Sequence, residues 1–399
     1  MAAPGPGPTT MTTAAALDGP AAARSLRDVS AAQAAASEAG RTLSAPMVDA
    51  LWASGLMTYL NAPEAGGCEP SFAEVIETWI ELAWQDGSLG WIGIANFPSA
   101  MAASVFLPDA GFGELFGDPN ERVTVGGQFF PNGTGDMSGD GYVLSGAWNF
   151  GSGTGHSRYV ACGFFPVVDG EAVFDVGEIR AAIVPREQVT FTDGWHVQGL
   201  RGTGSYDYSV SEVFVPQDRC FRLFSREPQR GSSSLFRLGL MPVTAAGHAS
   251  WALGVSKSMI DDVAELALTK ARMSDMETLA RRQTFQRNLA HFTGMWRAAR
   301  AGILEVFVEA ERVVGAGEPL TPRLRADMRV AATYATEASR EVAQWAHLAA
   351  GTSAIRNGSR LERAFRDLST GTQHAFISEK TYIDAAQIWL GLEEDLPGL

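Results

Sequence analysis

Residues 146–163 read GAWNFGSGTGHSRYVACG and combine two strand-like runs with a glycine-rich interruption. The glycines lie on both sides of Ser152, and Trp148 and Phe150 come just before this serine. Glycine lacks a Cβ atom, so its backbone lets another group approach closely. The stretch is compatible with two structures: a strand that presents Ser152 to a flat ligand, or a glycine-rich hairpin with a solvated serine.

Further strand-like runs surround this stretch and define a β region over residues 121–225. RVTVGGQFF, GYVLSGAWNF, SRYVACGFFPVV and YDYSVSEVFVP alternate or are wholly apolar, and turn sequences such as PNGTGD separate them. Short strands between glycine-rich turns are typical of an all-β domain, so we expect a small β-barrel or sandwich here. The Ser- and Gly-rich stretch LFSREPQRGSSS, residues 223–234, predicts a linker.

Helical periodicity dominates before the β region. In SFAEVIETWIELAWQDG, residues 71–87, Ser71 and Glu74 match a capping box. The apolar stripe that follows consists of Phe72, Val75, Ile76, Trp79 and Ala83. The next stretch, SLGWIGIANFPSAM, is apolar on nearly all sides, which indicates a helix wedged between other elements. These patterns predict a helical domain over residues 25–120, after a disordered tail over residues 1–24.

Four long amphipathic segments follow the linker and predict a four-helix bundle over residues 236–399. They are residues 249–271, residues 276–314, residues 321–351, and a segment that follows Arg366-Asp367 and includes HAFISEKTYIDAAQIWLGL. The fold class expected from the sequence is therefore a multidomain α+β protein in the order helical domain, β-barrel, helical bundle.

Composition narrows the range of partners. The chain has 399 residues with 46% hydrophobic and 19% charged side chains, as in a soluble protein with more than one packed unit. A net charge of -14 repels nucleic acid and anionic membrane surfaces. The N-terminus lacks a signal pattern, so we expect a cytoplasmic protein with no membrane partner. The net charge does not exclude a local basic pocket for a phosphate-bearing cofactor. The arginines that could line such a pocket are Arg201, Arg281, Arg282 and Arg287.

The common signatures of hydrolases, kinases and metal sites are missing from the sequence. We find no G-x-x-x-x-G-K, H-E-x-x-H, G-x-S-x-G or G-x-G-x-x-G motif. The three cysteines, Cys68, Cys162 and Cys220, lie far apart, and none of the six histidines is four residues from another. The sequence therefore predicts neither a disulfide framework nor a metal centre.

Two further motifs join the opening stretch in a family resemblance. They are GWHVQGLRGTGSYDYSVSEVFVP at residues 194–216 and LERAFRDLSTGTQHA at residues 361–375. In the order helices, β domain, bundle, these motifs resemble the acyl-CoA dehydrogenase superfamily over about residues 45–395. In that family a W-x-F-x-S-G strand lies against the isoalloxazine ring of a flavin. The resemblance implies that the Ser152 hydroxyl hydrogen-bonds near flavin N5 and that Trp148 or Phe150 shields the ring.

The C-terminal motif favours one branch of the superfamily. Acyl-CoA dehydrogenases carry a glutamate base shortly after the R-D pair, often within a Y-E-G-T type sequence. Here Arg366-Asp367 is followed by LSTGTQHAF, with His374 and no such glutamate. This departure resembles the two-component flavin monooxygenases of the same fold, in which a histidine after the R-D pair faces flavin and substrate. PNG at residues 131–133 also resembles their P-x-G turn.

The resemblance implies a flavin-dependent monooxygenase. Such an enzyme takes reduced FMN or FAD from a separate flavin reductase and uses O2 to oxygenate a small aromatic or amine substrate through a C4a-hydroperoxyflavin. Ser152 would hold flavin N5–H, and His374 would remove a proton from the substrate. Relatives pack bundle against bundle, so a homotetramer is expected.

Other residues receive roles from the resemblance as well. Gln128 and Phe129 lie on the segment that matches a flavin-flanking strand, which implies contacts between their backbone and the ring. The candidates for the phosphate or ribityl groups of the flavin are Arg201 and Ser205, and those for the substrate pocket are Asn96 and His156. We expect structural roles for Asp367, through a pair with an arginine, and for His248, His291 and His347 within the bundle helices.

Two other functions remain compatible with the sequence. One is an acyl-CoA dehydrogenase-type desaturase with a displaced base, such as Glu379. The other is a relative that has lost flavin and acts as a scaffold, against which Trp148, Ser152 and His374 argue.

Overall fold

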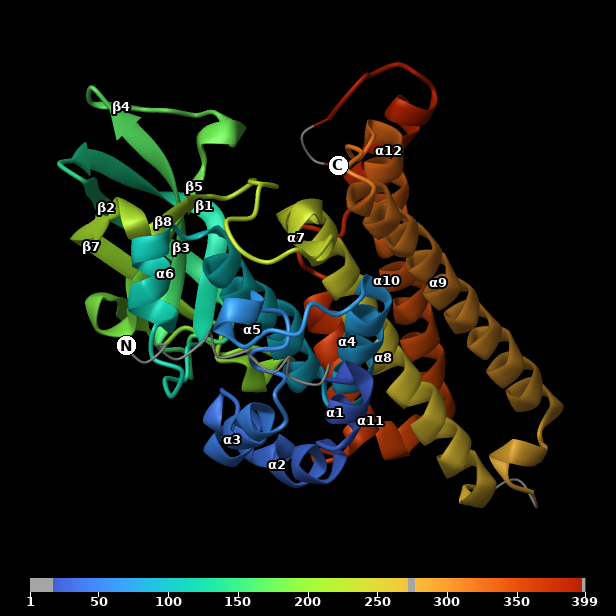
Figure 1. The fold of residues 1–399 in the computed structure, drawn as a ribbon. Coiled ribbons are helices and arrows are strands. Elements are labelled where there is room, and N and C mark those ends of the chain that lie inside the picture. The colour runs from blue at the N-terminus through green and yellow to red at the C-terminus, as the bar shows by residue number, and fades with distance from the viewer. Residues whose placement is uncertain (1–16, 272–276, 397–398) are drawn as a thin grey trace, which may run out of the picture.

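The computed structural model describes residues 17–271, 277–396 and 399. Over these residues the chain forms helices, then one β-sheet, then helices again (Figure 1). The first helices are α1 (Gly19–Arg24), α2 (Arg27–Gly40), α3 (Ala45–Ala53), α4 (Phe72–Gln85), α5 (Gly87–Phe106) and α6 (Asp109–Phe116). Helix α1 lies within residues 1–24, where the sequence predicted a disordered tail. The Asp18 side chain caps this helix by accepting a hydrogen bond from the Ala21 N–H. Residues 1–16 of the expected tail lie outside the described residues.

Helices α4 and α5 form as the sequence predicts. Ser71 Oγ accepts from the Glu74 N–H and the Glu74 carboxylate accepts from the Ser71 N–H, so the capping box is complete. Asp86 caps α5 by accepting from two backbone N–H groups. Helix α5 is long and apolar enough to span a membrane, but 83% of its most apolar window is buried inside the protein. It is a core helix wedged between other elements, as expected.

One eight-stranded sheet fills the middle of the chain. Its strands are β1 (Val125–Ser138), β2 (Gly141–Gly151), β3 (Tyr159–Val168), β4 (Glu171–Ala172), β5 (Arg180–Pro185), β6 (Thr190–Thr192), β7 (Tyr206–Pro216) and β8 (Cys220–Arg222). The order is β6-β7-β2-β1-β3-β5-β8, with β4 paired to β3. Strands β1 and β3 are parallel and the other pairs are antiparallel.

The sheet is open, so the β-barrel expected from the sequence is not confirmed. Strands β6 and β8 end the strand order, and each has only three residues. Barrel closure needs long tilted strands with continuous pairing around the ring, and these short edge strands offer too few hydrogen bonds for it.

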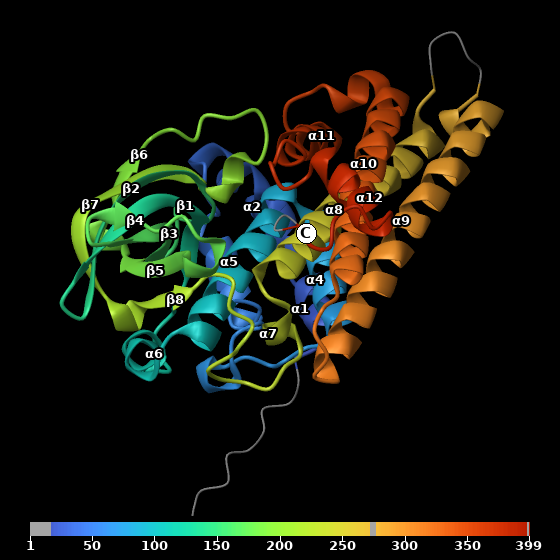
Figure 2. The same ribbon diagram turned by 90° about the horizontal axis from the view of Figure 1, so that it is seen from above.

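The C-terminal part contains three long helices and three shorter ones among the described residues. The helices are α7 (Leu235–Leu238), α8 (Leu240–Thr269), α9 (Gln283–Gly315), α10 (Pro322–Ala350), α11 (Arg360–Gly371) and α12 (Lys380–Trp389). Helices α8, α9 and α10 lie side by side (Figures 1 and 2). Residue 276, where one expected segment begins, lies outside the described residues.

The expected fourth long helix is instead two helices, α11 and α12, with residues 372–379 between them. Helix α11 ends at Gly371, which packs so closely on Trp251 that a Cβ atom there would lie 2.2 Å from the indole. The interruption puts His374 on a loop rather than on a helix.

Helix α5 positions the candidate site, because it lies between the sheet and α8 (Figures 1 and 2). On one side the Asn96 side chain donates a hydrogen bond to the Val125 carbonyl of β1. On the other, Gly247 of α8 lies against Ile94, where a Cβ atom would come within 3.1 Å of the isoleucine. We call the place where α5, the sheet and α8 meet the junction.

Candidate active site

Ser152 follows β2 directly and lies at the junction. Its carbonyl accepts from the Gly127 N–H of β1 over 3.1 Å, and its Oγ accepts from the Trp91 indole N–H of α5 over 3.0 Å. The Oγ atoms of Ser152 and Ser205 lie 3.1 Å apart, and Ser205 Oγ lies 2.7 Å from Thr203 Oγ1. Hydroxyl groups therefore join the first and second glycine-rich motifs of the sequence.

Asn96 supports the backbone around this serine. It is buried, and its Nδ2 donates to the Val125 carbonyl over 2.7 Å and to Ser157 Oγ over 3.2 Å. A Cβ atom on Gly153 would lie 2.0 Å from Asn96 Oδ1, so only glycine fits beside it. Asn96, predicted to bind substrate, thus has both Nδ2 contacts within the protein, while its buried Oδ1 lacks a hydrogen-bond partner.

Four aromatic side chains gather beside Ser152. The Trp91 ring centroid lies 4.9 Å from Trp251, 5.2 Å from His248 and 6.0 Å from His374. The two imidazole centroids are 4.3 Å apart. His374 Nδ1 accepts from the Phe376 N–H over 3.2 Å, which fixes the ring on the loop 372–379. The structure therefore places both Ser152 and His374 next to the Trp91 indole.

Burial keeps both imidazoles uncharged. It lowers the pKa of His374 to about 4, with a smaller contribution from the charge of Arg329. Burial also lowers the pKa of His248 well below its usual value, followed by the charges of His374 and Arg329. At neutral pH each ring therefore has one nitrogen that can accept a proton or a hydrogen bond, and in His374 this nitrogen is Nδ1.

Sequence reasoning did not find two members of this cluster, His248 and Arg329. His248 was expected to be structural, yet it contacts His374 directly. Arg329 of α10 is buried and lies over the Phe376 ring, 3.4 Å from its centroid. Histidine in the apolar stretch MPVTAAGHASWALG was the one available signal, and helical periodicity alone does not show which loop packs on that face.

Trp148 and Phe150 lie in different environments. The Trp148 indole is buried inside the sheet, where it donates to the Gly163 carbonyl over 3.0 Å and stacks on Tyr208. Phe150 is 63% exposed, has φ +61°, and lies 6.2 Å from the Trp195 ring. Phe150 is therefore the residue of the two that is free to cover a ligand at Ser152.

Gln128 and Phe129 lie where β1 bends away from β3. The Gln128 N–H donates to the Tyr208 hydroxyl over 2.8 Å, so this group is used within the sheet. The register of β1 with β3 shifts between Gln128 and Gly133, which leaves Phe129 outside the regular pairing. The Phe129 ring packs 6.3 Å from Phe221 and lines a small cavity of about 20 Å³ toward α8.

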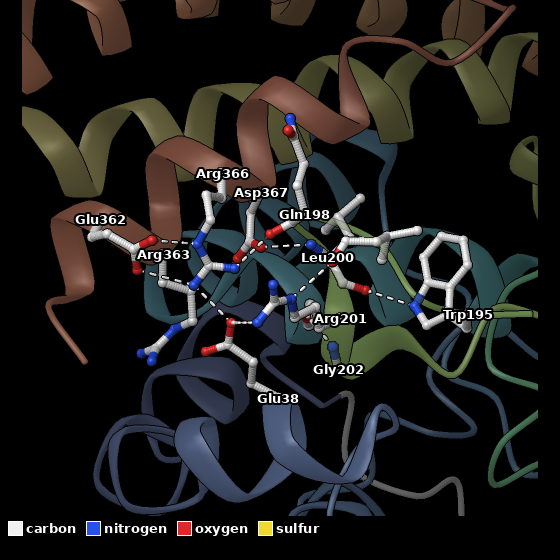
Figure 3. Close-up of polar contacts among 12 residues, drawn as sticks. Glu38, Trp195, Gln198, Leu200, Arg201, Gly202, Glu362, Arg363, Arg366 and Asp367 are labelled. Carbon is white, nitrogen blue, oxygen red and sulfur yellow. Dashed lines mark hydrogen bonds and ion pairs between the residues drawn. The ribbon is translucent and has the colours of Figure 1, made fainter. Parts of the chain in front are cut away.

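Arg201 belongs to an ion-pair network that holds α11 on α2 (Figure 3). Its Nε donates to the Val197 carbonyl over 2.8 Å, and its guanidinium lies 3.7 Å from Glu38. Arg366 contacts Glu38 over 2.7 Å and also pairs with Glu362. These contacts occupy Arg201 with protein groups, so its predicted role at the flavin stays a prediction.

Asp367 does not form the expected pair with an arginine. Its Oδ1 accepts from the Leu200 N–H over 2.6 Å (Figure 3), and its Oδ2 is buried without a hydrogen-bond partner. Burial raises the pKa of Asp367 to about 8, and the charge of Asp86 adds to the effect. The contact with Leu200, which has φ +56°, fixes the second glycine-rich motif against α11.

The remaining candidates lie away from the aromatic cluster. His156 faces Thr42, with 3.5 Å between Nδ1 and Oγ1, and burial lowers its pKa to about 4. Arg282 and Arg287 lie at the start of α9, far from the sheet (Figure 1), on a cleft of about 790 Å³. Glu379, the alternative base, is exposed at the N-cap of α12. Within the described residues, no group of three acidic, histidine or cysteine side chains could hold a metal ion.

The residues around Ser152 fit a flat heterocycle with polar edges. The exposed Phe150 ring is held in a backbone conformation that bulky residues rarely adopt, a type of strain that accumulates at functional sites. Beside it lie a hydroxyl pair, Ser152 and Ser205, and the indole of Trp91. An aromatic surface next to hydroxyl groups suits the apolar face and hydrogen-bonding edge of a flavin ring.

Comparisons with known proteins agree with this chemistry. The family model for the acyl-CoA dehydrogenase C-terminal domain matches residues 246–379. Indole-3-acetate monooxygenase of Pseudomonas putida is 30% identical over 358 residues, 90% of each chain. The oxygenase subunit HsaA of Mycobacterium tuberculosis, a flavin-dependent monooxygenase, is 27% identical over 365 residues, 86% of this chain and 87% of its own.

A solved structure shows the same fold with a flavin bound. XiaF from Streptomyces sp., in complex with FADH2 and glycerol, superposes with a TM-score of 0.87 at 25% identity and covers 96% of this chain and 97% of its own. A relative 30% identical over nine tenths of its length establishes the family. The chain belongs to the two-component flavin-dependent monooxygenases that share the acyl-CoA dehydrogenase fold.

Proposed function

We propose that this monooxygenase oxygenates a small aromatic substrate held beside His374 at the junction, with the flavin ring against Ser152. The observation that carries the proposal is the arrangement around Trp91. Its indole N–H donates to Ser152 Oγ, and its ring lies 6.0 Å from His374. A hydroxyl suited to a flavin and an imidazole suited to a substrate therefore both lie next to the Trp91 side chain. The relative named for indole-3-acetate supports an aromatic substrate.

Reduced flavin, when bound, would supply the two electrons that activate O2, of which one atom enters the substrate and the other leaves as water. The protein's part is to hold the ring and exclude water. The Ser152 hydroxyl hydrogen-bonds the ring edge, and Ser205 and the Trp91 N–H keep this hydroxyl in place. Phe150 covers the ring from the solvent side. FMN and FAD both remain compatible with these contacts.

His374 acts on the substrate. Its ring is uncharged because burial lowers its pKa to about 4, and its Nδ1 already accepts from the Phe376 N–H. A neutral imidazole has a single acceptor nitrogen, so Nδ1 takes a proton or hydrogen bond from a hydroxyl or ring N–H of the substrate in place of the Phe376 N–H. This transfer raises electron density on the substrate ring and prepares it for the electrophilic oxygen.

The partners follow from the family. A separate flavin reductase delivers reduced flavin, and O2 and the aromatic compound are the substrates. We also propose a cytoplasmic homotetramer. Exposed apolar side chains on two long helices support contact between copies: Val308 of α9 and Tyr334 and Leu348 of α10, which are 43%, 48% and 74% exposed.

Stopped-flow spectroscopy tests the proposal. The protein is mixed with anaerobically reduced FMN or FAD and then with oxygenated buffer, with and without indole or a phenol. We expect a lag before the absorbance of oxidised flavin returns, and a hydroxylated product when an aromatic compound is present. Reoxidation at the rate of free flavin, without product from any compound in an aromatic panel, contradicts the proposal.

A further inference from the structure

Arg329 of α10 is a buried cation with incomplete hydrogen bonding. Only 7% of the surface of this residue is exposed. Nη2 donates to the Phe376 carbonyl over 2.9 Å and to Thr381 Oγ1 over 3.3 Å. Nε and Nη1 are covered by protein and have no hydrogen-bond partner. Leaving N–H groups of a guanidinium buried and unpaired costs free energy, because in water each would be solvated.

The positive charge of Arg329 also lacks an ion-pair partner among the described residues. Burial lowers its pKa to about 10, and the carboxylate of Asp384 opposes this shift. Asp384, however, is bonded to Lys380 Nζ and does not hydrogen-bond Arg329. Buried charges in proteins are normally paired, so an unpaired buried arginine indicates a place for an anion.

This arginine lies next to the aromatic cluster of the candidate active site. Its guanidinium lies on the Phe376 ring, and the Phe376 ring centroid lies 5.9 Å from that of His248. The N–H of the same phenylalanine donates to His374 Nδ1. The positive charge of Arg329 is close enough to lower the pKa of both imidazoles.

We propose that Arg329 binds the carboxylate of an aromatic acid substrate, whose ring lies against Trp91 and the imidazoles of His248 and His374. The proposal rests on the proposed function and adds the chemical class of the substrate. Two unpaired N–H groups of a guanidinium match the two oxygens of a carboxylate, and such bonds are among the strongest polar contacts in proteins. Because Nε and Nη1 are covered, the acid displaces the part of the loop 372–379 at Phe376, which Arg329 holds. The same movement releases His374 Nδ1 from the Phe376 N–H.

Binding of the acid has a consequence for the base. A carboxylate on Arg329 offsets the charge that contributes to the low pKa of His374 and His248. Asp384, the carboxylate that acts on the arginine, is itself bonded to Lys380. The pKa of His374 is therefore higher with the acid bound than with an uncharged analogue of the same shape, so the acid makes His374 the stronger base.

The first experiment compares indole-3-acetate with indole-3-acetamide on the flavin-loaded protein by isothermal titration calorimetry. The two compounds have nearly the same shape, and only the acid carries a charge. We expect the acid to bind about tenfold tighter or more, as a charge-assisted bond to a buried group allows. NMR of labelled histidines should show a pKa rise with the acid alone. Equal affinities, or no binding of the acid, overturn the proposal.

Variants of Arg329 make the test specific. R329M should bring the affinity for the acid down to that for the amide and leave the amide unaffected, and R329K should restore part of the preference. Arg323→Met is the matched control, because Arg323 lies on the same helix and its side chain is 62% exposed. A preference for the acid that survives in R329M overturns the proposal. If R329M does not fold, the proposal is tested by the affinities of R329K and of the unmodified protein for the acid and the amide.

Failure of this inference is distinguishable from failure of the proposed function. Uncharged indole has no carboxylate, so its hydroxylation and the lag in flavin reoxidation report on oxygenase chemistry alone. Indole hydroxylation together with equal binding of acid and amide removes only the carboxylate site. Preferred binding of the acid without any lag or product supports the site and contradicts the proposed function.

Discussion

The imidazole rings of His248 and His374 lie with their centroids 4.3 Å apart, one on α8 and the other on the loop between α11 and α12. Two cationic rings at this distance in a buried place would repel each other strongly. The pair is therefore stable only while at least one of the two rings is uncharged. The position of His374, the proposed base, therefore depends on the ionisation state of His248 on α8.

The pair predicts loss of stability in acid. The pKa of His374 falls to about 4 in the folded protein, below the usual value of 6.5, so the unfolded chain binds more protons between these pH values. The free energy of unfolding should drop by up to about 3 kcal/mol as pH falls from 6.5 to 4. Urea unfolding of the unmodified protein and of H374Q across this range measures the effect. A variant as acid-sensitive as the parent would show that His374 does not contribute.

His374→Ala should lower hydroxylation while flavin binding persists. The imidazole accepts the substrate proton, and general base catalysis contributes about a hundredfold or more to the rate. The flavin contacts proposed at Ser152 are not altered by this change. Product yield per reduced flavin and flavin affinity are the two measurements, with His291→Ala on the exposed side of α9 as the control. Unchanged product yield would remove His374 from the mechanism.

Ser152→Ala should shorten the lag before oxidised flavin returns and release more hydrogen peroxide per product. The change removes a hydroxyl that also accepts the Trp91 N–H over 3.0 Å, so the ring edge loses its partner and the indole its anchor. One lost hydrogen bond of this kind is worth about 1 kcal/mol, or roughly a fivefold faster decay. Ser138→Ala, at the exposed end of β1, serves as the control. A lag equal to that of the control would contradict the role.

Much of this site could be predicted from the sequence, and the part that could not depends on long-range packing. The motif around Ser152 indicates a candidate site by itself, because glycines beside a serine in a strand let a ligand approach the backbone closely. His374 was found through a motif near the C-terminus. His248 and Arg329 carry no local signal, since each sits in an ordinary helix and becomes special only when the loop 372–379 packs on it.

The same reasoning explains the errors in the fold. Periodicity located α4 and its cap correctly because these features are local. Closure of the sheet depends on whether β6 and β8 pair with each other. The sequence pattern of a three-residue strand is too short to predict this pairing. The break after Gly371 depends on its contact with Trp251, a residue of another helix.

Asn96→Ala should destabilise the fold more than it affects substrate binding. The Asn96 Nδ2 bonds to Val125 and Ser157 are buried, and their loss leaves a carbonyl and a hydroxyl without this donor. We expect the free energy of unfolding to fall by about 2 kcal/mol. Chemical denaturation measures the loss, and titration with an aromatic ligand below the melting range measures binding. Full stability with weak ligand binding would instead support the substrate-binding role predicted from the sequence.

Asp367→Asn should stabilise the protein more at pH 9 than at pH 5. Burial raises the pKa of Asp367 to about 8, whereas the usual value is 3.8, so the folded state binds the extra proton between these values. Stability due to this group is present below pH 3.8 and is lost as pH rises toward 8. Asparagine keeps an oxygen acceptor for the Leu200 N–H and removes the buried charge beside Asp86. Unfolding measured at the two pH values checks this, with Asp327→Asn on α10 as a control at a partly exposed carboxylate. An equal effect at both pH values would mean that Asp367 is not protonated in the folded state.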